Sequence, residues 1–470
     1  MNPLEISSQQ FREISERIVS LATDFLEHID GQAISPATSG VECEKLFRTR
    51  LPEQGLGDKS LEDLSQVIQH SRAQNGRFFG YVLGSGEPVG AAADLLASVI
   101  NQNVTAWRSG PAAVAIEQTV VGWLAEAIGC GGFHGHLTGG GSSANLMGLA
   151  MAREAKAPAN ESGVGEKPVV YASEEVHMSI PKSVALLGIG RDNLRLVPVD
   201  ESFRVLPSKL DELIRHDKKS GNLPIAVVAS AGTVKTGAID PLRQIAEIAR
   251  EHDLWMHVDG AYGALAAIAE RAKFDGLELA DSISLDPHKW LYQPLDCGCL
   301  LYRSQEAAQQ AFAHTGDYAR SLVNDPVEGF AFFEESIELS RRFRALKLWL
   351  SLRYHGLSAF RESIRQDLRH SRQLADMVAK HPDFELVATG DLSAVCFRYA
   401  GANKKTEAEL NQLNEKVLKR LLQRGRVYLS NADVRGKFCL RACMVNHRTK
   451  DSDVEAVISE VTAAAAEIQS

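Results

Sequence analysis

Two short segments constrain this sequence more than any other feature, because each ends a predicted strand with an ionisable side chain. Residues 282–290 read SISLDPHKW, a short alternating run that Pro287 interrupts just before Lys289. Residues 254–259 read LWMHVD, an apolar run that ends at Asp259 and is followed by the small residues of GAYG. Because open α/β sheets bind ligands at the carboxyl edge of their strands, the amine and the carboxylate are expected to share one site.

A lysine amine and a carboxylate at one site are what pyridoxal 5'-phosphate (PLP) requires. Lys289 can hold the cofactor aldehyde as a Schiff base, and Asp259 can keep the ring nitrogen protonated so that the ring accepts electrons. Each residue also has an ordinary interpretation, Lys289 as a surface lysine and Asp259 as the N-cap of a segment that begins at Ala261. The pairing of the two favours PLP as the cofactor.

A phosphate site is predicted from residues 136–145, which read HLTGGGSSAN. Gly140 and Gly141 let backbone amides approach an anion, and Ser142 or Ser143 can cap the helix that follows. A glycine run alone is typical of many tight turns. Together with the lysine and the acid, it predicts that Gly140, Gly141 and Ser142 bind the cofactor phosphate.

Strand-like and helix-like patterns alternate in the middle of the chain. Strands are predicted over 168–172, 194–198, 225–230 and 254–258, with helices over 179–187, 207–215 and 241–251. This alternation predicts an α/β fold with a mostly parallel sheet covered by helices on both faces. We expect three regions: an N-terminal helical segment over 1–75, a large cofactor-binding domain over 76–345, and a small C-terminal α+β domain over 346–470.

Composition argues against several functional classes. A net charge of −9 disfavours nucleic acid or an anionic membrane as the main partner. The seven cysteines include no Cys-x-x-Cys pair, so neither a disulfide framework nor a zinc cluster is indicated. The N-terminus does not read as a signal peptide, and no apolar run is long enough to span a bilayer. A cytoplasmic protein is therefore expected.

The segments around Lys289, Asp259 and the glycine run, with several others, resemble the group II PLP-dependent decarboxylases and occur in the same order. This family includes aromatic-L-amino-acid, glutamate and cysteine sulfinate decarboxylases. The matching segments cover most of the chain: FFGY at 78–81, GGS at 140–142, VH at 176–177, AGT at 231–233, HVD at 257–259, PHKW at 287–290, RRFRALK at 341–347 and FCLR at 438–441. The resemblance implies an aspartate-aminotransferase-like fold, PLP as cofactor and decarboxylation of an L-amino acid. It also implies a homodimer in which the N-terminal segment wraps the partner subunit.

The resemblance assigns further roles. It implies that His177 stacks on the cofactor ring and acts in catalysis with Lys289 and Asp259. The cofactor would also contact Thr233, Ala261 and His288. Tyr81 would form part of the substrate pocket, and Arg441 would bind the substrate α-carboxylate. Ordinary alternatives are a structural histidine, a turn hydroxyl at Thr233 and a half-buried core tyrosine.

Two departures from the family pattern leave the reaction open. Asp286 stands where the decarboxylases have asparagine, and carbon–carbon lyases of phosphorylated sphingoid bases carry an acid there. Counting back without gaps from Arg341 places Phe332 at the loop tyrosine that protonates the product. Tyr318, a water molecule or His177 could replace that tyrosine, or the product could be an aldehyde formed with ammonia and hydrogen peroxide. An aminotransferase and a catalytically degenerate binding subunit are the remaining alternatives.

Other residues carry weaker signals. His134 and His136 share one face of a predicted strand, as metal ligands can, but no third ligand is identifiable and ordinary loop histidines are favoured. Trp107 and Arg108 could both face the active site. Alternatively, Trp107 lies in a core and Arg108 is exposed to solvent. The side chain of the substrate is not fixed by the sequence.

Overall fold

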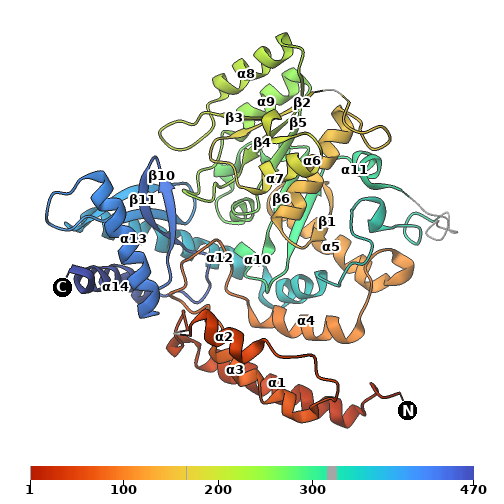
Figure 1. The fold of residues 1–470 in the computed structure, drawn as a ribbon. Helices are drawn as coiled ribbons and strands as arrows, with labels where there is room; N and C mark the ends of the chain where they lie inside the picture. Colours follow the sequence, from red (N-terminus) through yellow and green to blue (C-terminus); the bar gives the residue numbers. More distant parts are fainter. Residues whose placement is uncertain (1, 37, 166, 315–324, 470) are drawn as a thin grey trace.

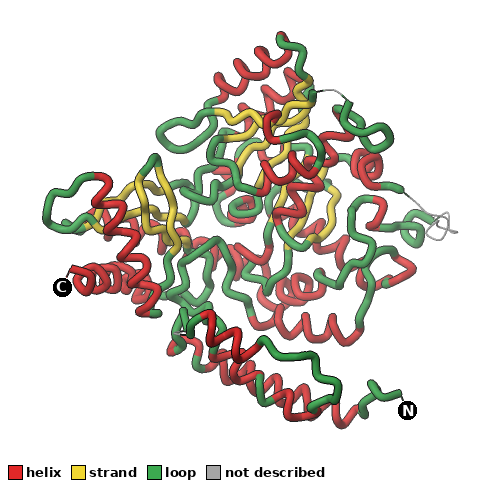
Figure 2. Tube along the Cα trace, viewed as in Figure 1, coloured by secondary structure: helices red, strands yellow, loops and turns green. Residues whose placement is uncertain are grey.

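The structure is a computed structural model that describes residues 2–36, 38–165, 167–314 and 325–469. A seven-stranded sheet forms the centre of the large domain (Figures 1 and 2). Its strands are β1 (His134–Thr138), β2 (Pro168–Ser173), β3 (Leu194–Val197), β4 (Leu223–Ser230), β5 (Trp255–Asp259), β6 (Ser282–Leu285) and β7 (Gly298–Tyr302). The spatial order is β1-β7-β6-β5-β4-β2-β3, and only β7 runs antiparallel to its neighbours. The predicted mostly parallel sheet is confirmed.

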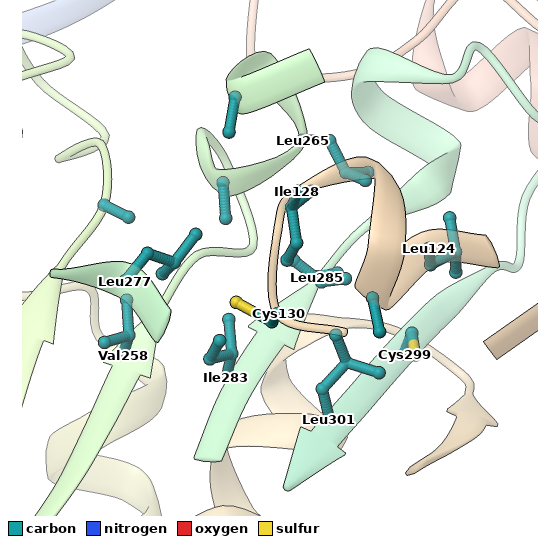
Figure 3. Packing of buried hydrophobic residues seen from close by; sticks show 14 of the residues in the cluster. Leu124, Ile128, Cys130, Val258, Leu265, Leu277, Ile283, Leu285, Cys299 and Leu301 are labelled. Atoms are coloured by element: carbon teal, nitrogen blue, oxygen red, sulfur yellow. The ribbon is translucent and has the colours of Figure 1, made fainter. Parts of the chain in front are cut away.

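Helices cover both faces of this sheet. One face packs against α6 (Gly141–Lys156), α7 (Ser179–Leu186) and α11 (Gln305–Phe312). The other packs against α5 (Pro111–Ala127), α8 (Pro207–Lys219) and α9 (Leu242–His252). Figure 3 shows Val258, Ile283 and Leu285 of the sheet in the second core, which also contains Leu124 of α5. Because side chains alternate along a strand, Asp259 and Ser284 point to the opposite face, toward α6.

The small domain has its own sheet and core. Strands β8 (Phe384–Thr389), β9 (Ala394–Tyr399), β10 (Ser430–Val434) and β11 (Lys437–Cys443) form an antiparallel sheet in the order β10-β11-β9-β8. It packs against α13 (Glu407–Arg424) and α14 (Asp451–Gln469). The long helix α12 (Ala345–Lys380) is interrupted at Gly356 and contributes to the cores of both domains. A small C-terminal α+β domain is thus confirmed, while the three residue ranges stay a prediction.

The N-terminal residues form an arm along one edge of the molecule (Figure 1). Its helices are α1 (Ser8–Glu27), α2 (Gly40–Phe47) and α3 (Leu64–Gln69), and α4 (Pro88–Ile100) follows on the body of the protein. Ser7 and Ser39 start α1 and α2 with reciprocal capping boxes. In the described part of the chain, every helix is too short or too polar to cross a membrane.

Candidate active site

A cavity of about 320 Å³ opens at the carboxyl ends of β4, β5 and β6. The structure brings all nine predicted cofactor-binding residues to its lining: Gly140, Gly141, Ser142, His177, Thr233, Asp259, Ala261, His288 and Lys289. They come from segments spread over about 150 residues of sequence, and the parallel strand order places them at one edge of the sheet.

Lys289 lies on the short helix α10 (Pro287–Trp290), which begins directly after β6. Its Nζ lies 2.8 Å from Oδ2 of Asp286. The next residue, Trp290, is fully buried and stacks on Tyr262 with ring centroids 6.1 Å apart. The packed tryptophan fixes the helix, so the lysine amine is held in the cavity.

Asp259 is the last residue of β5 and is almost fully buried. Its Oδ1 accepts hydrogen bonds from the backbone amide of Ala261 and from Oγ of Ser284, both at 3.2 Å. The capping interpretation is therefore correct in part. Both donors use the same oxygen, and among the described residues Oδ2 has no hydrogen-bond partner. That oxygen remains for a donor in the cavity.

The glycine segment forms the start of α6. Gly140 is the N-cap with φ 142°, and no side chain caps the helix, so the predicted cap by Ser142 or Ser143 is wrong. The helix begins earlier than the sequence suggested, because glycine backbone takes the turn and puts both serines inside the first turn. A Cβ on Gly141 would lie 2.5 Å from the Cβ of Ala261, so only glycine fits there. The uncapped amides and the helix dipole suit an anion.

Asp286 lies against this glycine segment, and a Cβ on Gly141 would be 3.0 Å from its Oδ2. Oδ2 pairs with Lys289 and lies 3.6 Å from Nε2 of His288, whereas Oδ1 is buried without a hydrogen-bond partner among the described residues. His288 donates its Nδ1 proton to the carbonyl of Cys297 at 2.7 Å, and burial lowers the pKa of its imidazole. The acid that departs from the family pattern thus contacts both the lysine and the anion site.

His177 lies between β2 and α7, with its ring at the cavity. Burial lowers the pKa of this imidazole, although the carboxylate of Asp259 opposes the shift. Nδ1 is 2.8 Å from Oγ of Ser179. Thr233 also lines the cavity, but its hydroxyl accepts a hydrogen bond from the amide of Ala238 at 3.2 Å, as the turn interpretation expects.

Tyr81 and Arg441 do not line the cavity of this chain. Tyr81 is 50% exposed, and its hydroxyl accepts a 3.0 Å hydrogen bond from Tyr428. Arg441 is buried behind the cavity, where its guanidinium donates to Oγ of Ser430 and to the carbonyl of Val234. Val234 is a lining residue, so Arg441 supports the cavity wall. Binding of a carboxylate by Arg441 stays a prediction.

Phe332 is the residue that a gapless count from Arg341 places at the loop tyrosine of the family. Its side chain is fully buried within its own chain, with the guanidinium of Arg341 at 4.3 Å from the ring centroid and Phe330 at 4.8 Å. Phe332 does not line the cavity of its own chain, and its match to the loop tyrosine of the family stays a prediction. Tyr318, the alternative proton donor, lies outside the described residues.

Among the described residues, His134 and His136 belong to no cluster of possible metal ligands. His136 is fully buried, and this burial holds the pKa of its imidazole well below the usual range, with smaller contributions from the cations Arg341 and Arg344. Cationic neighbours disfavour a metal ion. His134 is exposed, and Trp107 packs against the large core.

Several lining residues were missed by the sequence analysis: Gly139, Ser143, Asn145, Ser230, Gly232, Val234, Tyr262 and Leu295. Ser230 ends β4 and could have been found by the same strand-end argument that found Asp259. Asn145 carried no signal, because one polar residue on a mostly buried helix is uninformative without its neighbours.

Comparisons with known proteins identify the family of the chain. Residues 43–400 match the family described as the pyridoxal-dependent decarboxylase conserved domain. An aromatic-L-amino-acid decarboxylase of Bacillus atrophaeus is 33% identical, over 99% of this chain and 97% of that protein. A phenylacetaldehyde synthase of Petunia hybrida is 31% identical, over 93% and 90%. The crystal structure of Oryza sativa TDC with PLP and tryptamine has a TM-score of 0.93 at 27% identity, over 100% of both chains.

Proposed function

The chain belongs to the pyridoxal-dependent decarboxylase family and decarboxylates an amino acid with PLP, and we propose that its substrate is an aromatic L-amino acid and its product the amine. The observation that carries the cofactor and the reaction is that Lys289, Asp259 and the uncapped start of α6 meet in one cavity, whereas the aromatic substrate rests on the relatives. An amine, an acid and an anion site are the three groups that hold this cofactor.

The residues of the cavity fit PLP. Lys289 would hold the cofactor aldehyde, Asp259 would hold the proton of the ring nitrogen, and the first amides of α6 would bind the phosphate. When bound, PLP supplies a ring that accepts the electrons released as the carboxylate leaves. The free Oδ2 of Asp259 and the close approach of Gly141 to Ala261 are the features of this chain that favour the fit.

The protein side chains position and shield the reacting groups. Asp259 is fixed by two donors on one oxygen, so its other oxygen keeps one orientation. His177 is held by Ser179 and presents its second ring nitrogen to the cavity. The lining residues Tyr262 and Leu295 add apolar surface beside the charged groups.

The relatives support the aromatic substrate. The 33%-identical protein is an aromatic-L-amino-acid decarboxylase, and tyrosine decarboxylases of Petroselinum crispum are 31% identical. A second candidate product is the aldehyde, because the phenylacetaldehyde synthase is similar to the same degree. We favour the amine because the 33%-identical relative and the tyrosine decarboxylases are decarboxylases.

Substitution of Lys289 tests the proposal. Lys289→Ala should lose the visible absorbance of bound PLP and reduce turnover at least about 10³-fold, because covalent catalysis is lost. Carbon dioxide, amine and peroxide would be measured together with tyrosine, tryptophan, phenylalanine and glutamate as substrates. Lys182→Ala, on α7 near the same cavity, is the control and should keep both signals. Unchanged absorbance in Lys289→Ala would refute the cofactor assignment, and peroxide matching the carbon dioxide would favour the aldehyde.

We further propose that the protein is a homodimer in which the partner subunit covers the N-terminal arm. In α1 none of the 20 residues is buried, and Phe11, Ile18 and Val19 are each more than 40% exposed. Four large apolar residues of α4 are also exposed: Leu95, Leu96, Val99 and Ile100. Exposed large apolar side chains gathered on a helix favour an interface. Light scattering should give about twice the chain mass of 51.2 kDa. Phe11→Glu with Ile18→Glu should lower it toward one chain, whereas a single-chain mass for the unaltered protein would refute the dimer.

A cytoplasmic location is also proposed. All seven cysteines are free thiols, and six of them are buried. A reducing compartment keeps thiols in this state.

A further inference from the structure

We propose that a buried hydrogen-bond relay places the proton of His177 on Nε2, the ring nitrogen at the cavity. The relay consists of Trp255, Ser282, His257, Asn145, Ser179 and His177. It deepens the proposed function, because it concerns the residue expected to lie on the cofactor. The proton position can nevertheless be measured without cofactor or substrate.

The first half of the relay lies between β5 and β6. Nε1 of Trp255 is 2.9 Å from Oγ of Ser282, and that oxygen is 2.8 Å from Nδ1 of His257. The indole N–H can only donate a hydrogen bond. Ser282 therefore accepts from Trp255 and has its own proton available for His257.

The second half leads through α6 to the cavity. Nε2 of His257 is 2.9 Å from Oδ1 of Asn145, and Nδ2 of Asn145 is 3.0 Å from Oγ of Ser179. With Nδ1 of His257 accepting from Ser282, the ring must carry its proton on Nε2 and donate to Asn145. The amide of Asn145 then donates to Ser179, whose hydroxyl proton is directed to Nδ1 of His177.

A separate contact gives the same proton position at His177. The backbone amide of Ser179 lies 3.3 Å from Nδ1 of the ring. Because a backbone amide can only donate, Nδ1 acts as an acceptor here as well. Two donors therefore converge on Nδ1, and a neutral ring must carry its proton on Nε2.

Burial keeps both rings of the relay neutral. Burial lowers the pKa of His257 to about 4 and also lowers that of His177. The charged groups near His177 are Asp259 and Asp286, which raise its pKa, and Lys289 and Lys182, which lower it. The five relay residues behind His177 are all less than 7% exposed, so water has little access to the hydrogen bonds.

Gly148 provides the space that the relay requires. A Cβ at this position of α6 would lie 2.6 Å from Nδ1 and Cε1 of His257. The glycine lets the helix approach the strand closely enough for Asn145 to reach the ring. Asn145 is therefore a positioning residue, and so is Ser282, which does not line the cavity. Their combined effect is that His177 offers an N–H donor to an anionic group in the cavity.

The test is ¹⁵N NMR of histidine-labelled protein without cofactor, because the shifts of the two ring nitrogens report which one carries the proton. The signal of His177 would be assigned from its loss in His177→Asn. In the unaltered protein Nε2 should be protonated and Nδ1 unprotonated. Ser282→Ala removes a hydroxyl that is remote from the cavity but leaves the amide contact of Ser179 in place, so the ring-nitrogen shifts of His177 should move part of the way toward those of a ring with its proton shared between both nitrogens. Ser282→Thr, which keeps the hydroxyl, should restore the original pattern.

The matched control is Ser183→Ala. Ser183 is a buried serine on α7 that donates to the carbonyl of Ser179 at 2.8 Å without belonging to the relay, so its loss should leave His177 unchanged. Should Ser282→Ala not fold, Trp255→Phe removes the first donor and should shift the same signal in the same direction. A proton on Nδ1 in the unaltered protein, or unchanged shifts in folded Ser282→Ala, would overturn the proposal. An intact relay in a protein that releases no carbon dioxide would refute the proposed function instead.

Discussion

Asp286 is the single residue whose charge most alters the expected behaviour of the site. Its carboxylate is 3% exposed, pairs with Lys289 and lies against the glycine segment that suits a phosphate. A phosphate group carries close to two negative charges at neutral pH, and like charges in a buried site repel. Binding of the cofactor must therefore proceed against this carboxylate, with the ammonium of Lys289 as its compensating charge.

Asp286→Asn should bind PLP more tightly than the unaltered protein, by about tenfold at pH 8, because one buried negative charge beside the phosphate is removed. The amide keeps the size of the carboxyl group, so the packing should be retained. Titration of the cofactor-free protein with PLP, followed by absorbance, would measure the dissociation constant. Pyridoxal, which lacks the phosphate, is the control ligand and should gain much less. Weaker PLP binding by Asp286→Asn would show that the acid is a required ligand.

At the residue scale, the sequence was sufficient to predict the site residues at the ends of strands. It was insufficient to predict residues that act on the site through hydrogen bonds to other side chains. Lys289 and Asp259 could be predicted, because the carboxyl ends of adjacent parallel strands meet at one edge. The relay through Asn145 and Ser282 could not be predicted, because its order depends on how α6 packs on β5. Arg441 was assigned by resemblance, and its contacts are to Ser430 and Val234, which only the packed structure shows.

At the scale of elements, hydrophobic period and turn residues predicted most of the large domain. The predicted helix over 179–187 and the predicted strand over 168–172 each agree with α7 and β2 to within one residue at either end. Pro207, at the start of a predicted helix, begins α8, because its fixed φ suits a first turn.

The errors at this scale have physical causes. The antiparallel direction of β7 could not be predicted, since a buried strand has the same apolar pattern in either direction. The serine cap of α6 was wrong because glycine backbone started the helix earlier. The packing of Phe332 under Arg341 could not be predicted, because a count along the chain does not show how a side chain packs.

At the scale of the whole molecule, α12 joins the two domains, and a buried acid lies at the junction. Asp367 of α12 accepts hydrogen bonds from the hydroxyl of Tyr292 at 2.7 Å and from the amide of Asn446 at 3.2 Å. Tyr292 follows the helix of Lys289 and Asn446 follows β11, so the carboxyl group connects the cofactor site with the small domain. Burial raises the pKa of Asp367 to about 7, against two hydrogen bonds that lower it.

This acid should make the stability of the protein depend on pH. Its pKa is higher in the folded state than its usual value of 3.8, so the folded state binds more protons. The stabilisation is complete below about pH 4 and is lost as the pH rises to about 7, by on the order of 1.4 kcal/mol per pH unit at most.

Asp367→Asn carries no titrating proton and should lack this loss, so its melting temperature should exceed that of the unaltered protein above pH 7 and approach it near pH 5. Calorimetry from pH 5 to 8 measures the difference, and Asp376→Asn, at an exposed position of the same helix, should follow the unaltered protein. Parallel curves for Asp367→Asn and the unaltered protein would show that this carboxyl group does not titrate in the range.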